Sequence, residues 1–339
     1  MIRRINRISR WVPWLCGWVL ALGLTSCIKD DLSECGVEVR FRYTYNMVET
    51  DAFRQEVDRV ALYVFDAGDR LVAQQEAYGA GEADDFSMRL PFLPAGDYTF
   101  VAWANSTDRQ GEYADFDFPA LEIGDSKETL TARLPREADG ITHQSPLNSL
   151  LNGTLTASVG DGPRSMTIDM MKCTHTLRII LMPIQGGQTL DEANYSFVIA
   201  DRNGWLAHNA EPHKDDWVAY RPYYQELSVD TSTDYAGDEA AISSAVVTEL
   251  NTSRLIYDDE PRLIIRDTRD GQEMLNINLT WLLSLKAIGE HRADWSDQEY
   301  LDRQDEYAMT FFIDADNGTW MQNRILVNGW VLSLEEIEL

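Results

Sequence analysis

The residue with the most specific chemistry in this chain is Cys27, which follows Leu24, Thr25 and Ser26. Small residues before a cysteine are typical of a lipobox, in which the thiol is diacylated before a signal peptidase cuts the chain. Arginines at positions 3, 4, 7 and 10 precede an apolar run of fourteen residues, 11–24, whereas a spanning helix needs about twenty. The pattern predicts a lipoprotein signal peptide over residues 1–26. A transmembrane anchor and a secretory peptide with an incidental cysteine are the alternatives.

The residues after Cys27 bear on the destination of the lipidated chain. Ile28 stands where an aspartate would resemble an inner-membrane retention signal, so we expect the outer membrane. Lys29, Asp30 and Asp31 resemble the short surface-export tag that some Gram-negative anaerobes place after the lipidated cysteine. Residues 27–36 would form a lipidated tether.

The charge balance excludes one class of partner. The chain has a formal net charge of −27, and removing residues 1–26 leaves 25 basic against 56 acidic residues, or −31. Such a surface repels phosphate backbones, so nucleic acid is excluded as a natural partner. Solubility outside the cell accounts for the acidity, and binding of calcium or a basic protein is the alternative.

Two cysteines remain after the signal and the lipidated residue are set aside. Cys35 and Cys173 would lie in an oxidising compartment, where a disulfide between them is possible. Two separate buried thiols are the alternative. The sequence has no C-x-x-C motif, so redox catalysis has no support.

Strand patterns dominate the rest of the chain. Residues 37–45 alternate apolar and polar side chains, as in a half-buried antiparallel strand. Turns rich in Gly, Pro and Asp separate further strand patterns, at a spacing typical of β-sandwiches. The other expected strands cover residues 60–65, 70–75, 86–90, 98–104, 129–134, 150–159, 165–170, 174–181, 195–200, 262–266, 274–283, 307–313, 321–327 and 330–339.

The 313 residues after the signal fit two domains of ordinary size. Residues 37–160 are expected to form an N-terminal β-sandwich and residues 161–339 a C-terminal one. No pattern predicts a parallel sheet. Short helical turns are expected within residues 51–58 and over 297–305, where Ser296 and Glu299 form a capping box.

Other chemistry has little support. His208 and His213, with Glu211 between them, approach metal-ligand spacing but lack a third ligand, and Asp314 begins a calcium-like loop with no acid at its twelfth position. The chain has no G-x-S-x-G motif, so we predict neither an enzyme nor a metal site. Trp103, Trp281 and Trp330 fit core strand positions.

Four local motifs together resemble the fimbrillin-A-associated anchor family, the FimB-like, minor-fimbrium anchor lipoproteins of oral and gut anaerobes. They are the start from Cys27 to Cys35 followed by VEVRFRYTYNM, the segment VDRVALYVFD at 57–66, the segment LPAGDYTFVAWAN at 93–105, and the end formed by EYLDRQDEYAMTFFID at 299–314 with RILVNGWVLSL at 324–334. The resemblance covers nearly the whole mature chain except residues 205–260.

The resemblance implies two tandem transthyretin-like antiparallel β-sandwich domains with one or two short helices. It also implies a place at the base of a fimbrium that is assembled by donor-strand exchange, with a fimbrillin-like shaft subunit as partner and the outer membrane held through lipid on Cys27. No cofactor and no small-molecule substrate are expected. The candidate donor segment is Arg324 to Leu339, with Arg324, Ile325, Leu326, Val327, Trp330, Leu332 and Leu334 as its key residues.

In this hypothesis the anchor keeps its own first strand, so it offers no groove for further growth. An accessory or tip subunit is one alternative, and a core edge strand is the alternative for the C-terminal segment. A surface glycan-binding lipoprotein that uses exposed tryptophans such as Trp205 or Trp217 is the competing function.

Overall fold

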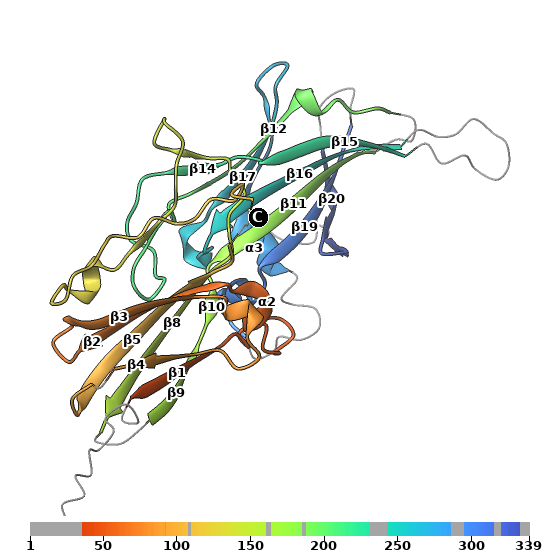
Figure 1. The fold of residues 1–339 in the computed structure, drawn as a ribbon. Helices are drawn as coiled ribbons and strands as arrows, with labels where there is room; N and C mark the ends of the chain where they lie inside the picture. The colour runs from red at the N-terminus through yellow and green to blue at the C-terminus, as the bar shows by residue number, and fades with distance from the viewer. Residues whose placement is uncertain are drawn as a thin grey trace, which may run out of the picture.

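The computed structural model describes residues 36–91, 93–107, 110–160, 164–184, 188–230, 243–285, 295–314 and 320–332. Within them the chain forms two pairs of facing sheets, which we name the first and the second sandwich (Figure 1). The predicted all-β sandwich fold is confirmed.

The first sandwich packs a three-stranded sheet on a five-stranded one. The three-stranded sheet has the order β4 (Ser87–Leu90), β1 (Val37–Arg42) and β9 (Arg164–Asp169). The five-stranded sheet has the order β10 (Met171–Lys172), β8 (Leu150–Val159), β5 (Gly96–Asn105), β2 (Arg59–Asp66) and β3 (Leu71–Tyr78). Alternate apolar side chains of β1 face those of β2 and β5, which is why these segments form a sandwich rather than isolated hairpins.

The second sandwich packs a six-stranded sheet on a five-stranded one. The six-stranded order is β15 (Tyr224–Asp230), β16 (Ser243–Ser253), β11 (Thr174–Pro183), β19 (Glu306–Ile313), β20 (Trp320–Val327) and β21 (Trp330–Leu332). The five-stranded order is β18 (Glu273–Asn278), β17 (Arg262–Asp267), β12 (Tyr195–Asp201), β14 (Val218–Tyr220) and β7 (Thr142–His143). A two-stranded ladder joins β6 (Ala132–Arg133) to β13 (Trp205–Leu206).

The helices are short. The described residues contain α2 (Phe53–Glu56), α3 (Leu279–Ser284) and α4 (Asp297–Arg303), besides 3₁₀ turns at Ala80–Glu82, Lys127–Thr129, Glu192–Asn194 and Tyr257–Asp259. Ser296 caps α4 as predicted, because its Oγ accepts a hydrogen bond from the Glu299 N–H at 3.1 Å. The Glu299 carboxylate accepts from Arg303 Nε at 2.9 Å. The prediction of a strand over 274–283 is wrong in its second half. The Asn278 side chain accepts from the Trp281 N–H at 3.0 Å and so caps α3 there.

The two sandwiches share buried side chains. Val101 and Trp103 of β5 face away from the first core and join the core of the second sandwich, together with residues of the connecting segment 106–149. Gly153 of β8 permits a close crossing within the first sandwich, since a Cβ atom there would lie 2.6 Å from the Asp169 carbonyl oxygen. Strand β8 of the five-stranded sheet therefore comes close to the end of β9 in the three-stranded sheet.

Three strand pairs are parallel, although no pattern in the sequence predicts one. They join β1 to β9, β11 to β19 and β14 to β7. Each pair unites strands that are far apart in the chain, which parallel pairing requires because it needs a crossover connection. Periodicity within one segment carries no information on such partners.

The chain passes from the first sandwich to the second later than the predicted boundary between residues 160 and 161. Strands β9 and β10 follow that point, yet they pair with β1 and β8 of the first sandwich. From Thr174 onward the strands belong to the second sandwich, and β7 joins this sandwich from an earlier part of the chain. Ile168 is fully buried in the first core, which explains why β9 stays there.

The buried side chain of Asp201, at the end of β12, makes the stability of the fold depend on pH. Its side chain is 1% exposed, and its Oδ2 atom has no hydrogen-bond partner among the described residues. Burial raises the pKa of this carboxyl from 3.8 to about 7. Between those pH values the native chain holds a proton that the unfolded chain has lost, so the free energy of unfolding falls as the pH rises from about 4 to about 7.

Replacing this carboxyl by an amide should remove that dependence. We expect Asp201→Asn to match the wild type near pH 4 and to be more stable by about 2–4 kcal/mol at pH 8. Urea unfolding at both pH values measures the difference, with the exposed Asp258→Asn as the matched control. A difference between Asp201→Asn and the wild type that is the same at both pH values would contradict the assignment.

Candidate functional site

Strand β1 occupies the centre of its sheet and is the first described element after the predicted tether. It pairs antiparallel with β4 on one side and parallel with β9 on the other, so both of its edges are used. Val37, Val39 and Phe41 are 1%, 0% and 7% exposed. On the outer face Arg42 forms an ion pair with Asp169 at 2.7 Å. The predicted alternation is therefore confirmed over residues 37–42, with the apolar face in the first core. The strand ends at Arg42 rather than at residue 45, and its pairing with β9 is parallel rather than antiparallel.

The segment after β1 is held against the second sandwich. The Arg303 guanidinium of α4 lies 4.2 Å from the Tyr45 ring centroid and donates to the Asn46 carbonyl oxygen at 3.4 Å. Nearby, Lys172 bridges Glu56 of α2 at 2.9 Å and Asp305, just before β19, at 2.5 Å. A cation–π contact and partly buried ion pairs thus join the segment that follows β1 to the second sandwich.

The candidate donor segment divides into two parts. The side chains of Ile325 and Val327 are fully buried in the second core, and β20 pairs with β19 over these positions. Strand β21 pairs with β20, with Leu332 opposite Ile325, and it ends the six-stranded sheet. Val331 is 62% exposed. The first part is therefore a core strand. The described portion of the second part, β21, is an edge strand among the described strands.

Several predicted residues lie outside the described residues. They are Cys27, Lys29, Asp30, Asp31, Cys35 and Leu334. Cys173 is fully buried, and its thiol donates to the Met171 carbonyl oxygen at 3.6 Å. Its pairing with Cys35 stays a prediction. None of the helices that the structure describes is both long and apolar enough to span a membrane.

The structure places His213 and Trp217 in the lining of one open pocket of about 470 Å³, whereas His208 is not part of this lining. His208 lies 4.0 Å from Glu128, while the His213 ring packs against Trp205 at 4.4 Å. The described residues hold no cluster of three or more His, Cys, Asp or Glu side chains suited to a metal ion. Trp217 is 47% exposed, and the Arg202 guanidinium lies 4.5 Å from its ring centroid.

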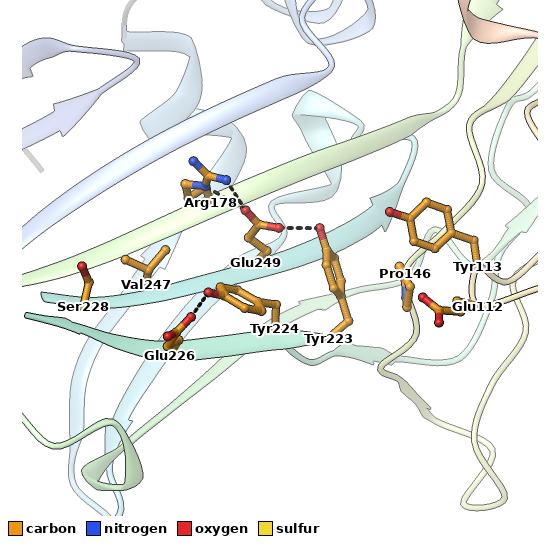
Figure 2. Close-up of a pocket in the computed structure, with 10 residues that line it drawn as sticks. All are labelled: Glu112, Tyr113, Pro146, Arg178, Tyr223, Tyr224, Glu226, Ser228, Val247 and Glu249. Carbon is orange, nitrogen blue, oxygen red and sulfur yellow. Dashed lines mark hydrogen bonds and ion pairs between the residues drawn. The ribbon is translucent and has the colours of Figure 1, made fainter. Parts of the chain in front are cut away.

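A larger open groove lies elsewhere, on the outer face of the six-stranded sheet (Figure 2). Its volume is about 720 Å³, and its floor comes from alternate residues of β15, β16 and β11. Tyr224 and Arg178 both stand opposite Glu249 in the strand register, so their side chains share this face. The lining residues are Glu112, Tyr113, Pro146, Arg178, Tyr223, Tyr224, Glu226, Ser228, Val247 and Glu249.

Hydrogen bonds between the polar side chains of the groove floor fix their orientations. The Tyr223 hydroxyl donates to Glu249 Oε2 at 3.0 Å, and Arg178 Nε donates to Glu249 Oε1 at 2.8 Å. The Tyr224 hydroxyl donates to Glu226 (Figure 2). Burial, followed by the charge of Glu249, raises the pKa of Tyr223, so its hydroxyl remains a donor at neutral pH.

The opposite wall comes from the connecting segment between the sandwiches. The Ala114 N–H donates to the Pro146 carbonyl oxygen at 2.7 Å, which holds Tyr113 beside Pro146. The Leu147 N–H donates to Asn251 Oδ1 of β16 at 3.0 Å and ties this wall to the floor. Tyr113, Tyr223 and Tyr224 belong to no motif that predicts a site from the sequence. The adjacent pair Tyr223-Tyr224 at the start of a strand is the one local feature of the sequence that could have indicated this groove.

The fold places the chain among all-β proteins built from two packed sandwiches. The sequence profile of the fimbrillin-A-associated anchor proteins Mfa1 and Mfa2 matches residues 32–336, and the chain belongs to this family. Membership confirms the resemblance and implies association with fimbriae at the cell surface. The family is one of structural anchor proteins rather than enzymes.

Solved structures agree with this assignment. A candidate polysaccharide-binding protein from Bacteroides thetaiotaomicron is 32% identical with a TM-score of 0.74, covering 90% of this chain and 100% of that one. A candidate adhesin from the same organism is 29% identical with a TM-score of 0.75, covering 88% and 98%. The fimbrial anchor protein Mfa2 from Porphyromonas gingivalis shares the fold at 17% identity, with a TM-score of 0.65 and coverage of 88% and 98%. No functionally curated protein matches the chain.

Proposed function

We propose that this protein is a lipid-anchored subunit that fixes a fimbrium to the outer membrane and terminates its growth. Lipid on Cys27 would hold the membrane end, and Lys29, Asp30 and Asp31 would direct the chain to the outer surface. Family membership and the lipobox sequence support this role. No cofactor takes part, and the partner is a fimbrillin-like shaft subunit.

The observation that carries the proposal is the position of β1. In donor-strand exchange a subunit accepts a neighbour's strand into a sheet that lacks one, and main-chain hydrogen bonds supply much of the affinity. Here β1 already lies between β4 and β9 and fills that place with its own chain. A subunit that keeps this strand offers no vacant position, so a fibre that reaches it stops growing.

The other attachment would come from the end of the chain. Of the segment Arg324–Leu339, the part up to Val327 is needed in the protein's own core, because Ile325 and Val327 are fully buried. Residues Trp330–Leu332, which form β21, pair with β20 alone among the described strands. We therefore assign the lending of a strand to the residues from Trp330 to the C-terminus, and β20 remains in place.

The state of the N-terminus tests this proposal against an accessory or tip subunit. Mass spectrometry of the protein recovered with purified fimbriae should find Cys27 with lipid and one uncut peptide across residues 37–47. A Cys27→Ser variant serves as the unlipidated reference. A new N-terminus within residues 40–60 would show that β1 is removed, and the chain would then be a polymerising subunit.

A further inference from the structure

The groove on the outer face of the six-stranded sheet has no part in either attachment. It lies along β15, whereas β21 lies at the other edge of the same sheet among the described strands. We propose that this groove is a binding site for a neutral oligosaccharide. The inference rests on the geometry of the groove and is independent of the anchor role.

Aromatic rings provide the apolar part of the site. Tyr113 and Tyr224 are 50% and 42% exposed, and Tyr223 lies between them in a half-buried position. The C–H faces of a pyranose ring pack against such aromatic faces, and tyrosine supplies this area while keeping a polar end in water. Rings from the floor and from the wall line the same groove, so successive sugar units can each meet one (Figure 2).

Fixed donors and acceptors provide the polar part. Arg178, Glu249 and Tyr223 form a connected network on the floor, so their orientations are set before a ligand arrives. Arg178 has N–H donors beyond those used on Glu249, because a guanidinium carries five. Sugar hydroxyls both donate and accept, and they match a carboxylate beside a guanidinium.

The charges select against other ligands. Three acidic lining residues, Glu112, Glu226 and Glu249, stand against one basic residue, Arg178, which disfavours sialylated and uronic-acid sugars. The acidic lining attracts a cationic peptide at long range, but on the floor such a peptide meets the Arg178 side chain, which is 57% exposed and already pairs with Glu249. A neutral ligand that is rich in hydroxyl groups avoids both repulsions.

Size and rigidity agree with this ligand class. The groove volume of about 720 Å³ lies within the usual range of about 300–1,000 Å³ for ligand pockets and has room for several sugar units. The wall is fixed to the floor through the Leu147–Asn251 hydrogen bond at 3.0 Å. A site that is already ordered loses less free energy when it binds.

Binding to a defined panel tests the inference. The mature full chain, in a detergent without a sugar headgroup, is applied to an array of neutral tetra- to hexasaccharides of glucose, mannose, galactose, xylose and N-acetylglucosamine. Sialylated and uronic-acid oligosaccharides and an arginine-rich peptide are included. Calorimetry then measures the affinity for each oligosaccharide that binds. We expect binding to at least one neutral oligosaccharide and to none of the charged probes.

Matched variants locate the site. Tyr224→Ala and Tyr113→Ala should each weaken binding at least about tenfold, whereas Tyr224→Phe, which keeps the ring, should weaken it by less than about threefold. Trp217→Ala removes an exposed ring outside the groove and should leave the affinity unchanged. Both replaced tyrosines are about half exposed, so the fold should tolerate their loss. The inference is overturned if no neutral oligosaccharide binds, if the tyrosine-to-alanine variants bind as the wild type does, or if a charged probe binds more tightly.

Discussion

A chain that starts at Tyr43, and therefore lacks β1, is expected to lose the folded state of its first sandwich and to regain it when a peptide of residues 36–46 is added. Val37, Val39 and Phe41 are almost fully buried, and their loss removes roughly 5–9 kcal/mol of burial free energy. That amount is comparable to the whole stability of an ordinary domain, about 5–15 kcal/mol. Strands β4 and β9 would also lose their shared neighbour.

Hydrogen exchange measures this outcome strand by strand. Amides of β2, β5 and β8 should lose protection in the shortened chain, while those of β11, β16 and β19 keep most of theirs. The peptide should restore the lost protection. A peptide with Val39→Asp and Phe41→Asp should fail, whereas one with Glu38→Gln and Arg40→Gln, changed only on the outer face, should still work. Full protection of β2 and β5 without any peptide would mean that β1 does not complete this sandwich.

The sequence alone predicts most of what depends on local pattern. Strict alternation locates β1, a run that is apolar on both faces locates β2, and the capping box at Ser296 locates α4. The family follows from local motifs spread between residues 27 and 334, and the all-β class follows from the strand patterns. These features depend on neighbours within one segment, so they can be found without coordinates.

Features that depend on distant segments escape the same reasoning. The prediction named no strand for β15 or β16, where buried threonines such as Thr248 interrupt the apolar pattern. One or two short helices are expected, and the structure adds α3. Asn278 caps this helix at a point where the apolar run predicts a strand. The groove unites residues 113, 146, 178, 223 and 249, which share no motif and meet only when the connecting segment packs against the six-stranded sheet.

Removing residues 329–339 is expected to release fimbriae from the cell while the protein itself stays in the membrane. This truncation keeps β20, whose Ile325 and Val327 belong to the core, and it keeps Asn328, whose N–H donates to the Ala308 carbonyl oxygen at 2.7 Å. A deletion that began at Ile325 would instead expose the core. The shorter deletion therefore separates loss of the donor strand from loss of the fold.

Side-chain replacements in the same segment provide the matched controls for the truncation. Leu332 stands opposite the buried Ile325 in the strand register, so Leu332→Asp together with Leu334→Asp should reproduce the release. Val331 stands opposite Leu326 and is 62% exposed, so Val331→Ser should leave the fimbriae attached. Alternate residues of a donated strand set its register, and only one of the two sets should matter.

The fraction of shaft protein in the cell-free medium, measured beside the amount of anchor in the outer-membrane fraction, tests the central claim most directly. For the chain without residues 329–339, we predict most shaft protein in the medium as assembled fibres and a wild-type amount of anchor in the membrane. Fibres that stay bound to cells carrying this truncated anchor would contradict the claim that its C-terminal strand holds the fimbrium.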